Sequence, residues 1–139
     1  LHKAIRRQRQ MCIRDRSYMK TFGELLHLIR SRQNASQLVK EVGISYVYLL
    51  DIEKGARTAP KESILIALAD KLEFHEGERE LFFDLAAKER NGIPADVTKY
   101  ILEHEEIIEV VRALNNSPVE LEYLKKIKQI AEEAGKNAR

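Results

Sequence analysis

The chain carries two short helical periods separated by a glycine, and this feature constrains the fold more than any other. Leu38 and Val42 are four residues apart and therefore share one face of a first helix. Leu49 and Ile52 are three residues apart and share one face of a second helix. Gly43 stands between them, where glycine permits the positive φ angle of a sharp turn. Two helices joined by so few residues must cross steeply, so the second is predicted to protrude.

The residues at the ends of these helices support the same interpretation. Asn34 is predicted to cap the first helix and Ser45 the second, because their side-chain oxygens can accept from unpaired first-turn amides. The second helix is expected to run from Ser45 to about Lys54, with Gly55 closing it. A protruding second helix of this kind can enter the major groove of DNA. The pattern is therefore typical of a helix-turn-helix.

Further helical periods surround this pair. A preceding helix is expected from Met19 to about Ser31, and a later one from about Glu76 to Glu89. Between them, Pro60 suits the first turn of a helix that carries apolar residues from Ile64 to Leu72. We therefore predict an all-α fold, with a five-helix DNA-binding head at residues 19–90 and a C-terminal helical extension.

From about Met19 to Arg90, the chain resembles the Cro and phage-repressor type of helix-turn-helix regulator, the XRE family. The resemblance rests on short motifs that stand at the expected positions along the helices. These are Phe22-Gly23-Glu24, Gly43-Ile44-Ser45, Tyr48-Leu49 and Ile52-Glu53-Lys54-Gly55. It implies a repressor-like head that binds double-stranded DNA in a sequence-specific manner.

The resemblance also implies which residues face the bases. Carried over by position, these are Tyr46, Val47 and Asp51, with Ser45 and Leu50 at the border. Val47 could pack on a thymine methyl group, and the Asp51 carboxylate could accept from a cytosine amino group. The alternative for Asp51 is a solvated charge on a helix surface.

Basic and hydroxyl side chains follow the second helix of the motif. Lys54, Arg57 and Thr58 suit contacts with phosphates, which position a protein without specifying sequence. Lys40 and Arg32 could extend this positive rim, although each could equally be an ordinary surface base. The resemblance further implies a structural ion pair between Arg30 and Glu53 that braces the protruding helix. Such a pair is costly to break from one side.

Charge and composition divide the chain into three parts. Residues 1–18 have a net charge of +5 and no clear apolar period, so we expect a disordered or non-native basic segment. The break Asn91-Gly92-Ile93-Pro94 is predicted to end the head, and residues 91–139 continue as helices with apolar stripes. Ser117 and Pro118 suit the start of the last helix. The extension is expected to dimerise or to bind a protein partner.

Several function classes find no support in the sequence. The four histidines are scattered and Cys12 is the single cysteine, so we expect no metal site, no cofactor and no enzyme activity. No apolar run approaches the roughly 18 residues of a membrane span, and no signal peptide is recognisable. We therefore expect a cytoplasmic protein without a membrane partner.

The function that follows is sequence-specific binding of double-stranded DNA by a transcriptional regulator, a repressor acting as a homodimer on a two-fold operator. The alternative is a protein-interaction adaptor, or an antitoxin, that keeps the repressor-like fold. Leu50, Asp51 and a net charge of −3 over residues 19–139 favour the alternative. A neighbouring gene for a small toxin would favour the antitoxin.

Overall fold

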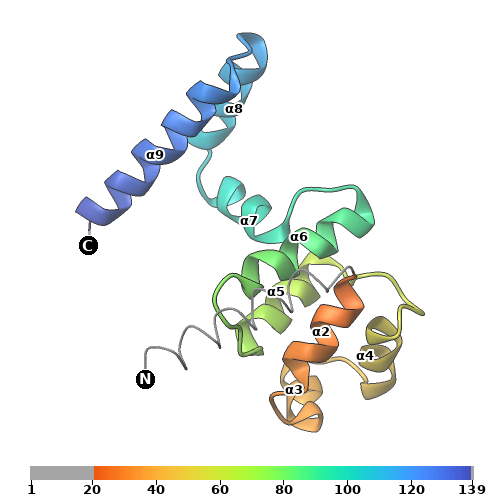
Figure 1. The fold of residues 1–139 in the computed structure, drawn as a ribbon. Helices are drawn as coiled ribbons and strands as arrows, with labels where there is room; N and C mark the ends of the chain where they lie inside the picture. Colours follow the sequence, from red (N-terminus) through yellow and green to blue (C-terminus); the bar gives the residue numbers. More distant parts are fainter. Residues whose placement is uncertain (1–20, 139) are drawn as a thin grey trace. The chain divides into compact units, whose positions relative to one another are not determined.

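A computed structural model describes residues 21–138, and this part of the chain is all-α, with no strand (Figure 1). The basic segment predicted at residues 1–18 lies outside the described residues. The helices, in chain order, are α2 (Phe22–Arg30), α3 (Ala35–Val42), α4 (Tyr46–Glu53), α5 (Glu62–Lys71), α6 (Glu78–Arg90), α7 (Ala95–Glu103), α8 (Glu106–Asn116) and α9 (Leu121–Asn137).

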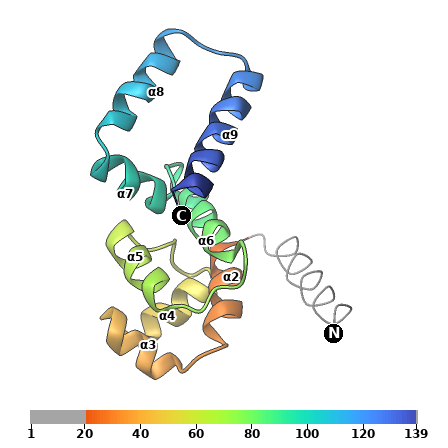
Figure 2. The ribbon, with the colours of Figure 1, turned by 90° about the vertical axis from the view of Figure 1, so that its left-hand side faces the viewer.

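The described residues divide into two compact units, with the division after Lys99. In the first unit, α2 packs against both α4 and α6, whereas α3 packs against α4 and α5 (Figures 1 and 2). Leu25, Leu26 and Ile29 of α2 are fully buried at the centre of this arrangement. The helix is thus amphipathic as its sequence predicts, with its apolar side at the centre of the core.

Phenylalanine rings join the first and last of these helices. The Phe82 ring lies 4.9 Å from the Phe22 ring, 5.3 Å from the Phe83 ring and 5.4 Å from the Phe74 ring, measured between ring centroids. Tilted and edge-on pairs at such distances add stability beyond the area that they bury. Phe82 therefore ties α6 to α2 and to the segment before α6.

The turn between α3 and α4 has the predicted local chemistry. The Asn34 side chain accepts from the amide of Gln37 at 3.1 Å, and the Ser45 hydroxyl accepts from the amide of Tyr48 at 3.0 Å. Gly43 ends α3 with a φ of +82°, a conformation that side chains with a Cβ rarely adopt. Both predicted caps and the predicted turn glycine are confirmed.

The start of α5 differs from the expectation. Pro60 lies outside the helix, which begins at Glu62 after the capping residue Lys61. Ala59 and Pro60 are instead buried within the first unit. The backbone of Ala59 is held there by side chains at the end of α6, so tertiary contacts override the local preference of proline for a first turn.

The end of the first unit also differs from the predicted break at residues 91–94. Asn91 does terminate α6, in the left-handed conformation with a φ of 52°. Ala95, however, is only 3% exposed and belongs to the core of the first unit. The beginning of α7 is thus part of this unit, because a small apolar side chain there completes the core.

The second unit contains α8 and α9, which run in opposite directions on either side of the segment 117–120 (Figures 1 and 2). The last helix begins at Leu121 rather than at Ser117 or Pro118, and it continues past Ala131 to Asn137. Neither α8 nor α9 contains a buried residue. In the part of the chain that the structure describes, no helix combines the length and the apolar character needed to cross a membrane.

Candidate nucleic-acid interface

Two buried side chains hold α4 in the first unit. Leu49 is fully buried and Ile52 is 1% exposed, and they lie on the same side of the helix. The side of α4 opposite Leu49 and Ile52 carries, at helical spacing, Tyr46, Val47, Leu50, Asp51 and Lys54. The structure thus places Tyr46, Val47, Leu50 and Asp51 on the side of α4 opposite its two buried residues. Ser45 caps the start of the helix, and Arg57 and Thr58 lie in the loop after it.

The exposed fraction of the side chains differs from residue to residue along this face of α4. Val47 is 66% exposed and Tyr46 is 46% exposed, although both are apolar or largely apolar side chains. Leu50 and Asp51 are half-buried, and Lys54 is exposed. Val47 and Tyr46 therefore contribute little to the core of the first unit.

Arg57 lies beside the end of α4. Its Nε atom is 3.8 Å from an Asp51 carboxylate oxygen, and its guanidinium lies 5.5 Å from the centre of the Tyr48 ring. The amides of Ala56 and Arg57 both donate to the Asp51 carbonyl, at 2.9 and 3.2 Å. The backbone therefore fixes Arg57 near Asp51, while the long, exposed ion pair itself contributes little to stability.

The loop after α4 is fastened to the end of α6. The amide of Ala59 donates to a Glu89 carboxylate oxygen at 2.7 Å, and the Ala59 carbonyl accepts from two Arg90 nitrogens at 2.6 and 3.1 Å. Ala59 is 1% exposed, so these contacts satisfy polar groups that water does not reach. They fix one end of the exposed segment that carries Arg57 and Thr58.

Arg30 and Glu53 form a bidentate ion pair between α2 and the end of α4. Arg30 Nε donates to Glu53 Oε1 at 2.6 Å and Nη2 donates to Oε2 at 2.9 Å. The Glu53 side chain is 4% exposed. The hydrogen bond and the charge of Glu53 raise the pKa of Arg30 above its ordinary value, against the effect of burial. The structure thus joins the two residues of the predicted brace.

Arg32, which could have extended the positive rim, is instead held in an ion pair. Its guanidinium binds both carboxylate oxygens of Glu78 at 2.6 and 2.9 Å, and Glu78 is only 2% exposed. Burial alone would raise the pKa of Glu78, but Arg32 and the backbone amide of His75 hold it below its ordinary value. The sequence does not predict this pair, because the two residues are 46 positions apart and no local pattern joins them.

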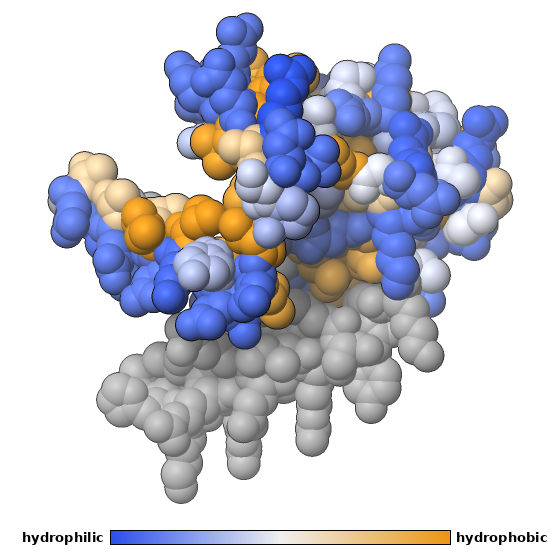
Figure 3. All heavy atoms as spheres, turned by 90° about the horizontal axis from the view of Figure 1, so that it is seen from above, coloured by the Kyte–Doolittle hydropathy of each residue, from blue (hydrophilic) through white to orange (hydrophobic). Residues whose placement is uncertain are grey.

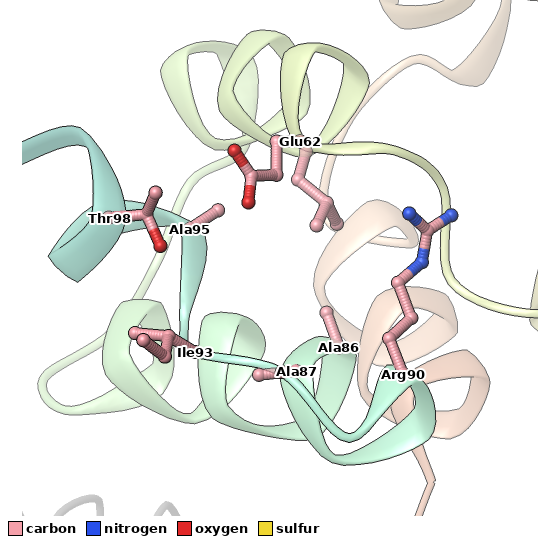
Figure 4. Close-up of a pocket in the computed structure, with 9 residues that line it drawn as sticks. Glu62, Ala86, Ala87, Arg90, Ile93, Ala95 and Thr98 are labelled. Carbon is pink, nitrogen blue, oxygen red and sulfur yellow. The ribbon is translucent and has the colours of Figure 1, made fainter. Parts of the chain in front are cut away.

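A separate cleft of about 380 Å³ lies in the first unit, between α5, α6 and the start of α7 (Figure 4). Its lining is largely apolar and includes Leu65, Ala86 and Ile93, with Glu62 at the start of α5. None of the residues predicted to meet DNA lines it. Within residues 21–138 there is no cluster of side chains suited to hold a metal ion.

The comparisons with family models, with curated proteins and with solved structures gave no match for this chain. The function is therefore inferred from the chain's own residues and their geometry.

Proposed function

We propose that the chain is a sequence-specific DNA-binding transcriptional regulator, a repressor, whose α2–α6 unit is a five-helix repressor-like head and whose α4 is the recognition helix. The observation that carries this proposal is the division of α4 into two faces. Leu49 and Ile52 anchor one face in the core, while Val47 and Tyr46 stay exposed on the other. A helix held from one side alone leaves its opposite side free to enter a groove, as a recognition helix does.

The exposed residues offer chemistry that suits base edges and phosphates. The Val47 methyl groups fit a thymine methyl, and the Asp51 carboxylate fits a cytosine amino group. Arg57 and Lys54 supply positive charge at the end of the same helix. A phosphate that attracts Arg57 would compete with Asp51 for its guanidinium, so Asp51 would be released toward a base. The Arg57–Asp51 pair would therefore couple the phosphate contact of Arg57 to the base contact of Asp51.

A single head of this kind has few basic groups near α4. Because each phosphate contact contributes a modest, salt-dependent gain, one head alone binds weakly. Two heads on a two-fold operator would add their contacts. We therefore propose that the DNA-binding form is a homodimer.

Selection of bound fragments from random double-stranded DNA, with the full chain, tests this proposal. The expected result is a palindrome whose half-sites lie about 10 base pairs apart or a multiple of that. Val47→Glu places a negative charge on the recognition helix and should abolish enrichment. Ile93→Glu is the matched control, since Ile93 is 62% exposed in the same unit but lies outside α4. Absence of enrichment with the unmodified chain would refute the proposal.

A protein-interaction adaptor is the second candidate, and the Asp51–Arg57 contact favours it. The carboxylate partly neutralises the cation that would meet phosphate, at an N–O distance of 3.8 Å. Residues 19–139 also carry a net charge of −3, which opposes contact with nucleic acid. Exchange of both Lys54 and Arg57 for Glu separates the candidates. A DNA-binding head loses its affinity for genomic fragments in that variant, whereas an adaptor shows no change.

A further inference from the structure

The cleft between α5, α6 and the start of α7 exists because small side chains line it. Ala86 and Ala95 are only 1% and 3% exposed, and Ala87 is half-buried. All three lie around the cleft in Figure 4. Protein interiors are otherwise close-packed, so these neighbouring alanines leave space that larger side chains would fill. The space measures about 380 Å³.

Backbone hydrogen bonds hold the wall of the cleft where α6 turns into α7. The amide of Gly92 donates to the Ala87 carbonyl at 3.0 Å, and the amide of Thr98 donates to the Pro94 carbonyl at 3.0 Å. Between them, Asn91 ends α6 in the left-handed conformation. Because these bonds fix the turn, the cleft is formed without a ligand, as small-molecule sites usually are.

Apolar side chains also reach the surface at other places, where they lie among polar groups (Figure 3). Those of α8 and α9 lie on open helix faces, since neither helix contains a buried residue. The cleft differs because three elements surround it. Nine residues line it, whereas a protein interface takes about 20–30 residues from each partner. Its size therefore suits a small molecule.

The volume and the lining set the body of such a molecule. An apolar cavity of about 150 Å³ takes up benzene, and small-molecule sites begin at about 300 Å³. A cleft of about 380 Å³ thus has room for one or two rings. Leu65, Ala86 and Ile93 give the lining its apolar character, so an apolar body gains by leaving water.

Glu62 supplies the one negative charge of this lining. In Figure 4, its carboxylate turns toward Ala95 and Thr98 at the edge of the cleft. Among the described residues, no hydrogen bond or ion pair engages this carboxylate. Glu62 is exposed, so a charged group that meets it stays near water while the apolar body enters the cleft.

Arg90 is the other charged residue of the lining, but its guanidinium is already engaged. Its Nε and Nη2 atoms both donate to the Ala59 carbonyl. Figure 4 shows the guanidinium turned away from the centre of the cleft, apart from the Glu62 carboxylate. The unpaired charge at the cleft is therefore negative, and it favours a cation over an anion.

We propose that this cleft binds a small organic cation, a compound with an apolar body of one or two rings and a protonated amine that pairs with Glu62. Such a ligand lies against Arg90, which holds Ala59 at the end of the loop that carries Arg57. An effect of the ligand on DNA rests on the proposed function. Binding itself does not, and it is measured without DNA, so the two proposals fail separately.

Benzylammonium, benzyl alcohol and benzoate test the proposal, because they share a ring and differ in charge. In methyl NMR spectra of the full chain, the ring should shift the signals of Ala86, Ala87 and Ala95. We expect benzylammonium to bind in about the millimolar range. It should bind about 3–5-fold more tightly than benzyl alcohol, with benzoate the weakest. Absence of shifts with benzylammonium, or any other order of affinity, would overturn the proposal.

Two substitutions separate the charge from the space. Glu62→Gln should abolish the preference for benzylammonium over benzyl alcohol. Glu80→Gln removes an exposed carboxylate outside the lining and should keep that preference. Ala87→Leu fills the cleft and should abolish binding of all three compounds, whereas Lys88→Leu adds the same side chain at an exposed position outside the lining and should leave binding unchanged.

The opposite results of these substitutions contradict the proposal. A preference that survives Glu62→Gln would mean that this carboxylate does not hold the amine. Binding that survives Ala87→Leu, in a variant whose Ala86 and Ala95 signals show it to be folded, would place the ligand outside the cleft. Alanine signals that move when the chain is diluted without any compound would mean that a second copy fills the cleft instead.

Discussion

Gly23 lies directly against the carbonyl group of Ile52, and a β-carbon at position 23 would stand 2.5 Å from that oxygen. The same β-carbon would lie 2.7 Å from the carbonyl oxygen of Glu53. Both oxygens belong to the backbone of α4 and cannot rotate away as a side chain does. The absence of a side chain at Gly23 therefore sets how closely α2 approaches the last turn of α4.

Gly23→Ala should lower the free energy of unfolding by about 1–3 kcal/mol, because one of the two helices must shift. Denaturant-induced unfolding, followed by circular dichroism, measures the change. Gly92→Ala is the matched control, since a β-carbon there meets no atom within 4 Å. Equal stability of the two variants would show that the close approach carries no energetic consequence.

The Arg30–Glu53 pair should be costly to break from one side only. Arg30→Met removes the bidentate partner of the buried Glu53 carboxylate and leaves only the exposed His27, whose Nδ1 lies 3.6 Å from Glu53 Oε2. We expect a loss of about 3 kcal/mol. Arg30→Met combined with Glu53→Met removes both charges and should recover most of that loss. A double-mutant cycle on unfolding free energies measures the coupling. Additive losses would argue against a shared, buried pair.

The Arg32–Glu78 pair predicts a pH dependence with a defined sign. The folded-state pKa of Glu78 lies below its ordinary value, so ionised Glu78 stabilises the fold. That contribution is complete above the ordinary glutamate pKa of about 4.3 and is lost as the pH falls through the lower folded-state value. Glu78→Gln should therefore cost about 3 kcal/mol at neutral pH and progressively less below pH ~4. Unfolding curves measured across this range check the convergence.

Arg57 should contribute to the salt dependence of DNA binding, if α4 is the recognition helix as proposed. Arg57→Ala should weaken binding to all sequences and reduce the slope of log affinity against log salt by about 1. Lys88→Ala, at an exposed position of α6, should leave the slope unchanged. Fluorescence anisotropy at several salt concentrations provides the measurement. An unchanged slope in the Arg57 variant would remove this residue from the proposed interface.

Local chemistry explains why parts of the fold could be predicted. Gly43, Asn34 and Ser45 act on backbone groups within a few residues, so their roles are visible in the order of residues alone. The apolar period of α2 likewise predicts its buried side. Pro60 shows the limit of this approach, because contacts from Glu89 and Arg90 keep Ala59 buried and delay the start of α5.

Some features of the candidate site could likewise be predicted from the sequence, and others could not. Helical spacing alone places Val47 and Asp51 on the side of α4 that lies opposite Leu49 and Ile52. The position of Arg57 beside Asp51 depends on backbone hydrogen bonds in the loop, and spacing does not predict them. The pairing of Arg32 with Glu78 joins residues 46 positions apart and depends on tertiary structure, so no local sequence pattern predicts it.

The burial of Ala95 has a practical consequence for anyone who dissects this protein. A fragment that stops at Arg90, where the helical pattern is first interrupted, would expose core side chains that the start of α7 normally shields. The melting temperature of this fragment would therefore be lower than that of the complete first unit. The smallest fragment worth expressing ends at Lys99, several residues beyond the helix break that the sequence shows at residues 91–94.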